Sequence, residues 1–164
     1  MIKMKSIIIY YSNNGKTKIV AETLAKKLNT DIIGIEDKKE RHGLRNKLKS
    51  SFDALTEKKT EISPNKIDLT EYNTVYFGTP VWYGKPTPAI MSIIDKSNLK
   101  DKNVVLFATM KGASAISTLK KMEEKIEPRG GRVIEKFSIK TKRKSKEKII
   151  RDSEVISKIL DLSI

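Results

Sequence analysis

The sequence contains no cysteine and only one histidine among its 164 residues. Without cysteine the chain cannot form disulfides, thiolate metal sites or thiol nucleophiles, and this absence agrees with the cytoplasmic location that we expect. His42 alone cannot build a site of several histidine ligands, so we predict neither a catalytic residue nor a metal site. The chain also lacks an apolar run long enough to cross a bilayer, and we expect no membrane span.

Acidic residues are scarce as well. The 20 Asp and Glu residues stand against 34 Lys and Arg residues, which gives a formal net charge of +14. A charge of this size bears on partners and solubility rather than on the fold. It permits an acidic protein, nucleic acid or an anionic membrane surface as a partner. The alternative is a lysine-rich background composition, because the lysines are spread over most of the chain.

What the sequence does contain is an alternation of apolar, β-branched runs with helical spacing of apolar residues. We predict strands at residues 7–11, 31–36, 74–78, 104–108 and 133–139. Helices are predicted at residues 20–28, 89–94, 115–127 and 149–160. The closing helix is defined by four apolar residues: Ile149, Ile156, Ile159 and Leu160.

A further helix is predicted within the polar and basic segment 37–65, where apolar residues recur at helical spacing: Leu44, Leu48, Phe52 and Leu55. Strands that alternate with helices indicate a parallel α/β sandwich of three layers. The length suits one domain, which we predict to span residues 1–164. Ligands of such sheets bind beyond the carboxyl ends of the strands.

The turn after the first strand has the composition of a phosphate site. The first N–H groups of a helix have no internal partner, and the helix dipole adds positive charge at the same place. This turn does not match the phosphate loop of nucleoside-triphosphate-binding proteins, because that motif needs a glycine where the chain has Tyr10. The alternative is that Ser12 and Thr17 only cap the helix. The candidate residues are Ser12, Asn13, Asn14, Gly15, Lys16 and Thr17.

Two later loops, each following a predicted strand, also contain residues suited to ligand binding. Adjacent aromatic residues, Trp82 and Tyr83, lie between Pro80 and Gly84 rather than on a periodic face, although core packing is the alternative for them. Aromatic side chains there offer a surface for a flat ring. The candidates in these loops are Thr79, Pro80, Val81, Trp82, Tyr83, Gly84 and Lys85, followed by Thr109, Met110, Lys111 and Gly112.

Taken together, the three loops resemble those of the flavodoxin family, in its short-chain form. Residues 11–17 are similar to the family's phosphate loop, residues 78–84 to its first ring-binding loop, and residues 109–112 stand where the second one falls. The resemblance implies a five-stranded parallel sheet of order 2-1-3-4-5 with helices on both faces. It also implies FMN as the cofactor, with Thr79 and Pro80 beside the ribityl chain and Trp82 and Tyr83 beside the isoalloxazine.

The function implied by the resemblance is that of an electron carrier between redox proteins, which we expect to be acidic, rather than an enzyme with its own substrate. Two alternatives stay open: an NAD(P)H-dependent quinone or flavin reductase, and a basic binding module on the same scaffold. Residues 136–148 hold seven basic residues and one acid, Glu147. They form either a docking patch or a solvated connection to the last helix. We do not expect nucleic acid as the partner, and the oligomeric state stays open between monomer and weak dimer.

Overall fold

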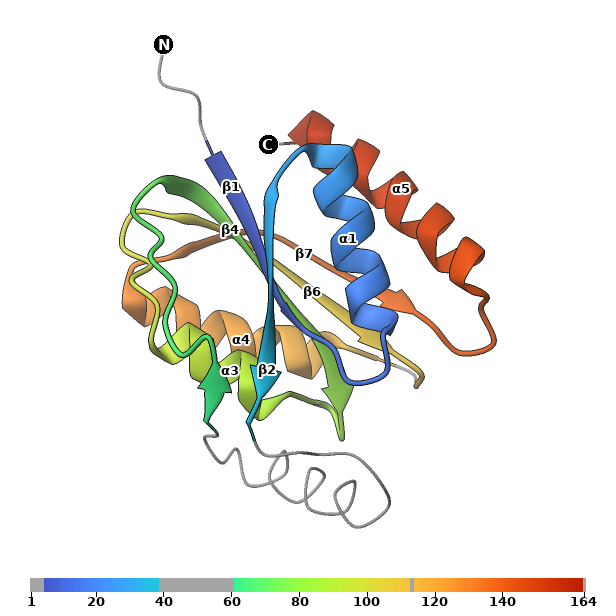
Figure 1. The fold of residues 1–164 in the computed structure, drawn as a ribbon, viewed down its shortest axis with the longest axis horizontal. Helices are drawn as coiled ribbons and strands as arrows, with labels where there is room; N and C mark the ends of the chain where they lie inside the picture. The colour runs from blue at the N-terminus through green and yellow to red at the C-terminus, as the bar shows by residue number, and fades with distance from the viewer. Residues whose placement is uncertain (1–4, 39–60, 113, 164) are drawn as a thin grey trace.

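The computed structural model describes residues 5–38, 61–112 and 114–163. Its centre is a parallel sheet of five long strands, flanked by helices on both faces (Figure 1). From one edge to the other these strands are β2 (Asp31–Asp37), β1 (Lys5–Tyr11), β4 (Tyr72–Trp82), β6 (Asn103–Met110) and β7 (Arg132–Lys140). The predicted class and the order of the parallel strands are confirmed. The helix predicted at residues 44–55, like His42, lies outside the described residues.

Two short strands were not predicted. β3 (Ile62–Ser63) pairs antiparallel with β2, and β5 (Lys85–Pro86) pairs antiparallel with the end of β4. Each has two residues, which is too short for a periodic hydrophobic signal in the sequence. The sheet therefore contains more strands than the five expected.

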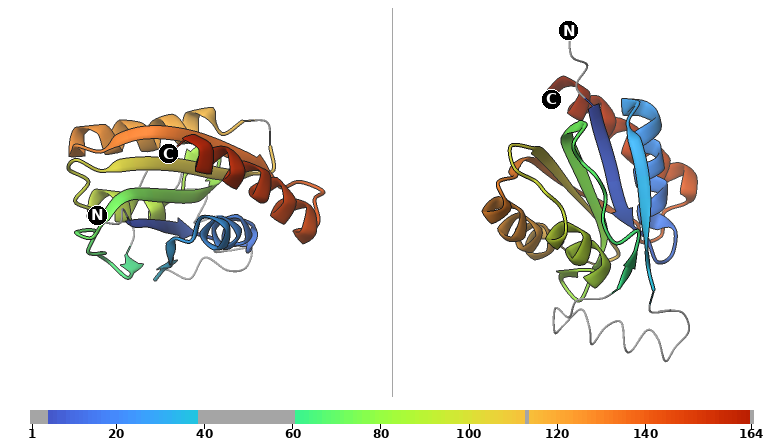
Figure 2. Two further views of the ribbon diagram at one scale, coloured as in Figure 1. Left: turned by 90° about the horizontal axis from the view of Figure 1, so that it is seen from above. Right: turned by 60° about the vertical axis from the view of Figure 1, so that its left-hand side comes forward.

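The helices form the two outer layers. α1 (Lys16–Leu28) and α5 (Lys146–Ser163) cover one face of the sheet, and α3 (Pro88–Asp95) and α4 (Ile116–Ile126) cover the other (Figures 1 and 2). A short 3₁₀ helix, Glu127–Arg129, follows α4. Of the apolar residues by which the closing helix was predicted, Ile149 and Leu160 are buried on α5, whereas Ile159 is 56% exposed.

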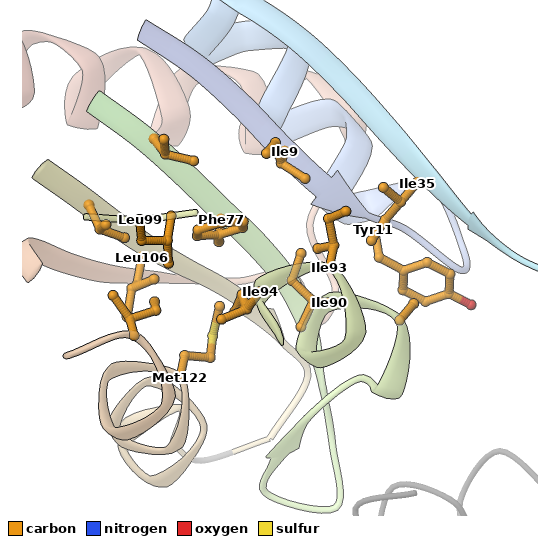
Figure 3. Packing of buried hydrophobic residues seen from close by; sticks show 14 of the residues in the cluster. Ile9, Tyr11, Ile35, Phe77, Ile90, Ile93, Ile94, Leu99, Leu106 and Met122 are labelled. Atoms are coloured by element: carbon orange, nitrogen blue, oxygen red, sulfur yellow. The ribbon is translucent and has the colours of Figure 1, made fainter. Parts of the chain in front are cut away.

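The layer between the sheet and the α3–α4 pair is the larger part of the apolar core. Ile90, Ile93 and Ile94 of α3 and Met122 of α4 pack toward Phe77 and Leu106 of the central strands (Figure 3). Residues 104–108 of β6 are almost wholly inaccessible, as a strand covered on both faces requires. This core fixes the strand ends relative to one another.

On the opposite face, two glycines and three aromatic residues form one row that crosses the sheet. The register places Gly34, Tyr10, Gly78, Phe107 and Phe137 side by side on five neighbouring strands. The Tyr10 ring lies over Gly34 and the Phe107 ring over Gly78, since a Cβ added to either glycine would lie within 3 Å of that ring. Phe107 also stacks on Phe137, with ring centroids 5.4 Å apart. The two glycines provide the space that the rings occupy.

At the amino ends of the strands, the Tyr72 hydroxyl donates to Asp31 Oδ2 at 2.5 Å, and this bond raises the pKa of Tyr72 to about 12. The fold thus favours the neutral phenol. Its contribution to stability is complete below pH 10, the ordinary tyrosine pKa, and is lost as the pH rises toward 12. We expect Tyr72→Phe to lower stability at pH 8 by less than ~1 kcal/mol and to flatten the decline above pH 10.

Urea unfolding at a series of pH values measures this effect. Tyr83→Phe is the control, because Tyr83 is 67% exposed and lies at the other end of the sheet. Identical alkaline slopes for the wild type and Tyr72→Phe would show that the bond to Asp31 does not contribute to stability.

Candidate functional site

A cleft of about 500 Å³ lies at the carboxyl ends of β1, β4 and β6. Sites for small organic ligands commonly have volumes of roughly 300–1,000 Å³. The wall is built by three chain segments, namely the turn after β1, the end of β4 with its hairpin, and the loop after β6. It consists of Asn13, Asn14, Lys16, Pro80, Val81, Trp82, Tyr83, Gly84, Thr109, Met110, Lys111, Gly112, Ser114 and Thr141. The structure thus brings together members of all three predicted loops.

Five predicted residues lie in the same segments but do not line the cleft. They are Ser12, Gly15, Thr17, Thr79 and Lys85. Two lining residues were missed by the sequence analysis. Thr141 follows the end of β7 directly, so the rule that ligands bind at strand ends could have found it had it been applied to the fifth strand. Ser114 carries no comparable signal.

The turn before α1 collects backbone N–H groups. Ser12 Oγ accepts from the N–H groups of Gly15 and Lys18 at 3.1 and 3.2 Å, and Asn14 Oδ1 accepts from Lys16 N–H at 3.1 Å. In this structure Ser12 and Asn14 therefore act as acceptors for the turn, which agrees with the capping alternative for Ser12 but not for Thr17, whose hydroxyl bonds to Thr109. The start of α1 and the Lys16 side chain on the cleft wall make this turn electropositive and suited to an anion, which would take over the amides that donate to Ser12 and Asn14.

Thr17 has a different position from the one expected of a ligand-facing hydroxyl. Its side chain is 1% exposed, and its Oγ1 lies 2.7 Å from Oγ1 of Thr109, which is equally buried. This hydrogen bond joins the first turn of α1 to the end of β6 across 92 positions of the chain. The bond fixes the turn before α1 relative to the loop after β6.

The predicted loop that begins at Thr79 is instead a β-hairpin as far as Pro86, and this corrects the sequence analysis. β4 continues to Trp82, which pairs with Lys85 of β5. The two residues between them, Tyr83 and Gly84, have φ values of 52° and 73°. Two consecutive left-handed residues are typical of the type I′ turn, whose twist matches that of the paired strands. A glycine at the second position could have indicated this turn from the sequence.

Two side-chain contacts hold the hairpin in place, one buried at its base and one exposed at its tip. At its base, Thr79 Oγ1 accepts from the Thr87 backbone N–H at 3.1 Å. At its tip, Ser117 Oγ of α4 donates to the Gly84 carbonyl at 2.6 Å. Thr79 thus supports the wall of the cleft without contacting its interior.

The two aromatic residues of the hairpin differ in their surroundings. Trp82 is half-buried and meets the ring of Tyr11 edge-on, with centroids 5.8 Å apart and planes at 87°. Core packing therefore accounts for part of the Trp82 side chain. Tyr83 is 67% exposed, although it lines the cleft. Together they give one wall of the cleft an aromatic surface that can accommodate a planar ring.

The cleft is electropositive. Lys16 and Lys111 lie on its wall, and none of the described residues that line it is acidic. Within the described part of the chain, His, Asp and Glu side chains do not gather in groups of three that could hold a metal ion. The arrangement therefore suits an anionic organic molecule with a flat ring.

None of the helices in the described ranges has the length and apolar character needed to span a membrane.

Comparisons with known proteins agree with this geometry. The family model described as flavodoxin matches residues 5–149. An uncharacterized protein of Methanocaldococcus jannaschii is 25% identical over 140 residues, which cover 84% of this chain and 75% of that protein. A crystal structure from Bacteroides uniformis superimposes with a TM-score of 0.77 at 20% identity, covering 90% of this chain and 96% of the other.

A flavoprotein of Lactobacillus acidophilus in complex with FMN superimposes with a TM-score of 0.69 at 22% identity, over 83% of this chain and 93% of that protein. At this level of identity the two crystal structures establish the similarity of fold.

Proposed function

The chain belongs to the flavodoxin family, and from this premise we propose that it binds FMN in the cleft and carries electrons between redox proteins. The observation that carries the proposal is that three loops, far apart in the sequence, form one cleft with an electropositive turn and an aromatic wall. A similar fold from Lactobacillus acidophilus was solved in complex with FMN, which supports the choice of flavin.

The chemistry of the cleft fits the parts of FMN. The turn at residues 12–17 would hold the dianionic phosphate through the amides that now converge on Ser12 and Asn14, assisted by Lys16. Trp82 and Tyr83 would contact the isoalloxazine, and Pro80 would border the ribityl chain. When bound, FMN would supply the electron transfer, while the protein sets its orientation and the surrounding charge.

Thr17, Thr79 and Thr109 would act mainly by holding the loops. Their hydroxyl groups are already engaged with one another or with Thr87 beneath the cleft. We propose that Lys111 and Gly112 border the ring from the third loop. Lys85, which pairs with Trp82 at the base of the turn, would contribute charge from outside the wall.

Titration of the apoprotein with FMN and with riboflavin tests the proposal. We expect FMN to bind with one-to-one stoichiometry and at least tenfold more tightly than riboflavin. Hydrogen bonds to a charged group contribute about 1.5–3 kcal/mol, and 1.4 kcal/mol corresponds to a factor of ten. Flavin fluorescence quenching and the visible spectrum measure both affinities.

Failure to bind either flavin would refute the proposal. Equal affinities would place the phosphate outside the turn. A protein that binds FMN and then oxidises NAD(P)H in the steady state, without a second protein, would be a reductase rather than a carrier.

A further inference from the structure

Five cationic residues either line the cleft or follow a lining residue within a few positions of the chain. We define the basic rim as Lys16, Lys111, Lys142, Arg143 and Lys146. Lys16 and Lys111 line the cleft itself. Lys142 and Arg143 are exposed and follow Thr141, which also lines it, and Lys146 begins α5. In the described chain none of the five has an ion pair with an acidic residue.

The rim is held in a defined place by the turn that carries it. The Thr141 N–H group donates to the Met110 carbonyl at 2.9 Å, and the Lys144 N–H group donates to the Thr141 carbonyl at 3.2 Å. Two acids lie near this turn: Asp152 is already paired with Lys144 at 2.7 Å and Lys148 at 3.0 Å, and Glu147, in the first turn of α5, forms no ion pair with a residue of the rim. The positive charge of Lys142 and Arg143 is therefore left for another molecule.

At the hairpin turn and at the start of α4, which follows the third loop, two large apolar side chains are exposed. Tyr83 is 67% exposed and Ile116 is 77% exposed. The hydrogen bond from Ser117 to Gly84 joins the start of α4 to the hairpin turn, which brings Ile116 close to Tyr83. Large exposed apolar side chains that occur together commonly mark a contact surface for another protein.

We propose that the basic rim and the Tyr83–Ile116 pair form the docking surface of an acidic electron-transfer protein. An apolar area bordered by polar and charged groups is the usual composition of a protein–protein interface. Nucleic acid would need cations along a path for phosphates and would make little use of the two apolar side chains. This inference rests on the proposed function, because docking here would bring the redox centre of the partner close to the flavin.

Complementary charge would act mainly on the rate of association. Electrostatic steering raises association rates by about 10- to 1,000-fold at low salt, and the effect falls steeply as salt is added. Electron transfer between the two proteins should therefore slow as the ionic strength rises, with a slope set by the charges of the rim.

The FMN-loaded protein and a photoreduced, acidic plant-type [2Fe–2S] ferredoxin, used as the probe partner, test this inference. In each productive encounter one electron leaves the iron–sulfur cluster and is gained by the flavin. The rim variant is Lys142→Glu/Arg143→Glu/Lys146→Glu. The matched control is Lys26→Glu/Lys96→Glu/Lys100→Glu, which reverses three exposed lysines away from the cleft and changes the net charge equally.

At about 10 mM ionic strength, where the Debye length is about 30 Å, we expect the rim variant to transfer electrons at least fivefold more slowly than the wild type. The control should change less than twofold. Ile116→Ser should slow the reaction without altering its dependence on salt, because it removes apolar contact and no charge. FMN affinity, measured separately, should stay within twofold in all variants, so a failure to bind flavin is distinguished from a failure to dock.

Equal losses in the rim and control variants would overturn the inference in favour of a net-charge effect. Unchanged rates in both would overturn it as well. Salt-sensitive binding of duplex DNA or of phosphatidylserine vesicles that is lost only in the rim variant would assign the surface to nucleic acid or to a membrane instead.

Discussion

Replacing Gly78 with alanine is expected to destabilise the protein by about 2–3 kcal/mol, the upper part of the range for overpacking a core. A Cβ at this position would lie 2.2 Å from Cζ of Phe107 and 2.4 Å from its Cε2. Although these atoms are at the end of a side chain, the ring has little room to move. Phe107 is 0% exposed and stacks on Phe137, with the two planes only 7° apart.

Gly34→Ala provides the matched control for this prediction. Its added Cβ would approach the hydroxyl of Tyr10 at 2.8 Å, but Tyr10 is 9% exposed and Gly34 lies near the edge of the sheet, so the ring can shift. We expect a loss of less than about 1 kcal/mol there. Chemical denaturation of both variants measures the difference.

Phe107→Leu in the Gly78→Ala background should recover part of the stability, since a smaller side chain no longer opposes the new methyl group. A strictly additive double variant would show that the cost of Gly78→Ala does not arise from Phe107.

Most of the parallel strands were predictable because each contains a short apolar run that the sequence separates clearly from its neighbours, although β7 is more polar. Residues 104–108 illustrate this, since burial on both faces leaves no polar position to confuse the pattern. The cleft followed from a rule of topology rather than from any one motif. Once the strands were assigned, their carboxyl ends had to meet at one edge of the sheet.

Contacts between distant segments could not be predicted in this way. The bond between Thr17 and Thr109 depends on two side chains that face each other only after α1 has packed on the sheet. The match between Gly78 and Phe107 likewise depends on the register of β4 and β6, which the sequence of neither strand specifies alone. In the hairpin, the second strand consists of Lys85 and Pro86 alone, and two residues are too few for hydrophobic periodicity to indicate a strand.

Tyr83 has a backbone conformation that is unfavourable for tyrosine, and its ring is the most exposed aromatic ring of the site. Its φ of 52° lies in the left-handed region, where an ordinary side chain costs roughly 1–2 kcal/mol relative to glycine and where asparagine is tolerated. An unfavourable residue retained beside a binding cleft suggests that binding, rather than stability, accounts for its presence. We therefore expect stability and flavin affinity to respond in opposite directions when Tyr83 is changed.

Tyr83→Asn should raise the free energy of unfolding of the apoprotein by about 0.5–1 kcal/mol, because Asn-Gly is a preferred pair for this turn. The same change should weaken FMN binding by about 10- to 100-fold, since stacking of an aromatic side chain on a heterocycle contributes roughly 1–3 kcal/mol. Urea unfolding of the apoprotein and fluorescence titration with FMN measure the two effects independently.

Tyr83→Phe isolates the contribution of the hydroxyl, because it keeps the aromatic surface and the unfavourable φ. We expect this variant to bind FMN within threefold of the wild type and to gain no stability. If Tyr83→Asn instead binds FMN as tightly as the wild type, the exposed ring does not contact the flavin. Trp82 would then be the aromatic contact that remains on this wall of the cleft, and Tyr83 would belong only to the docking surface.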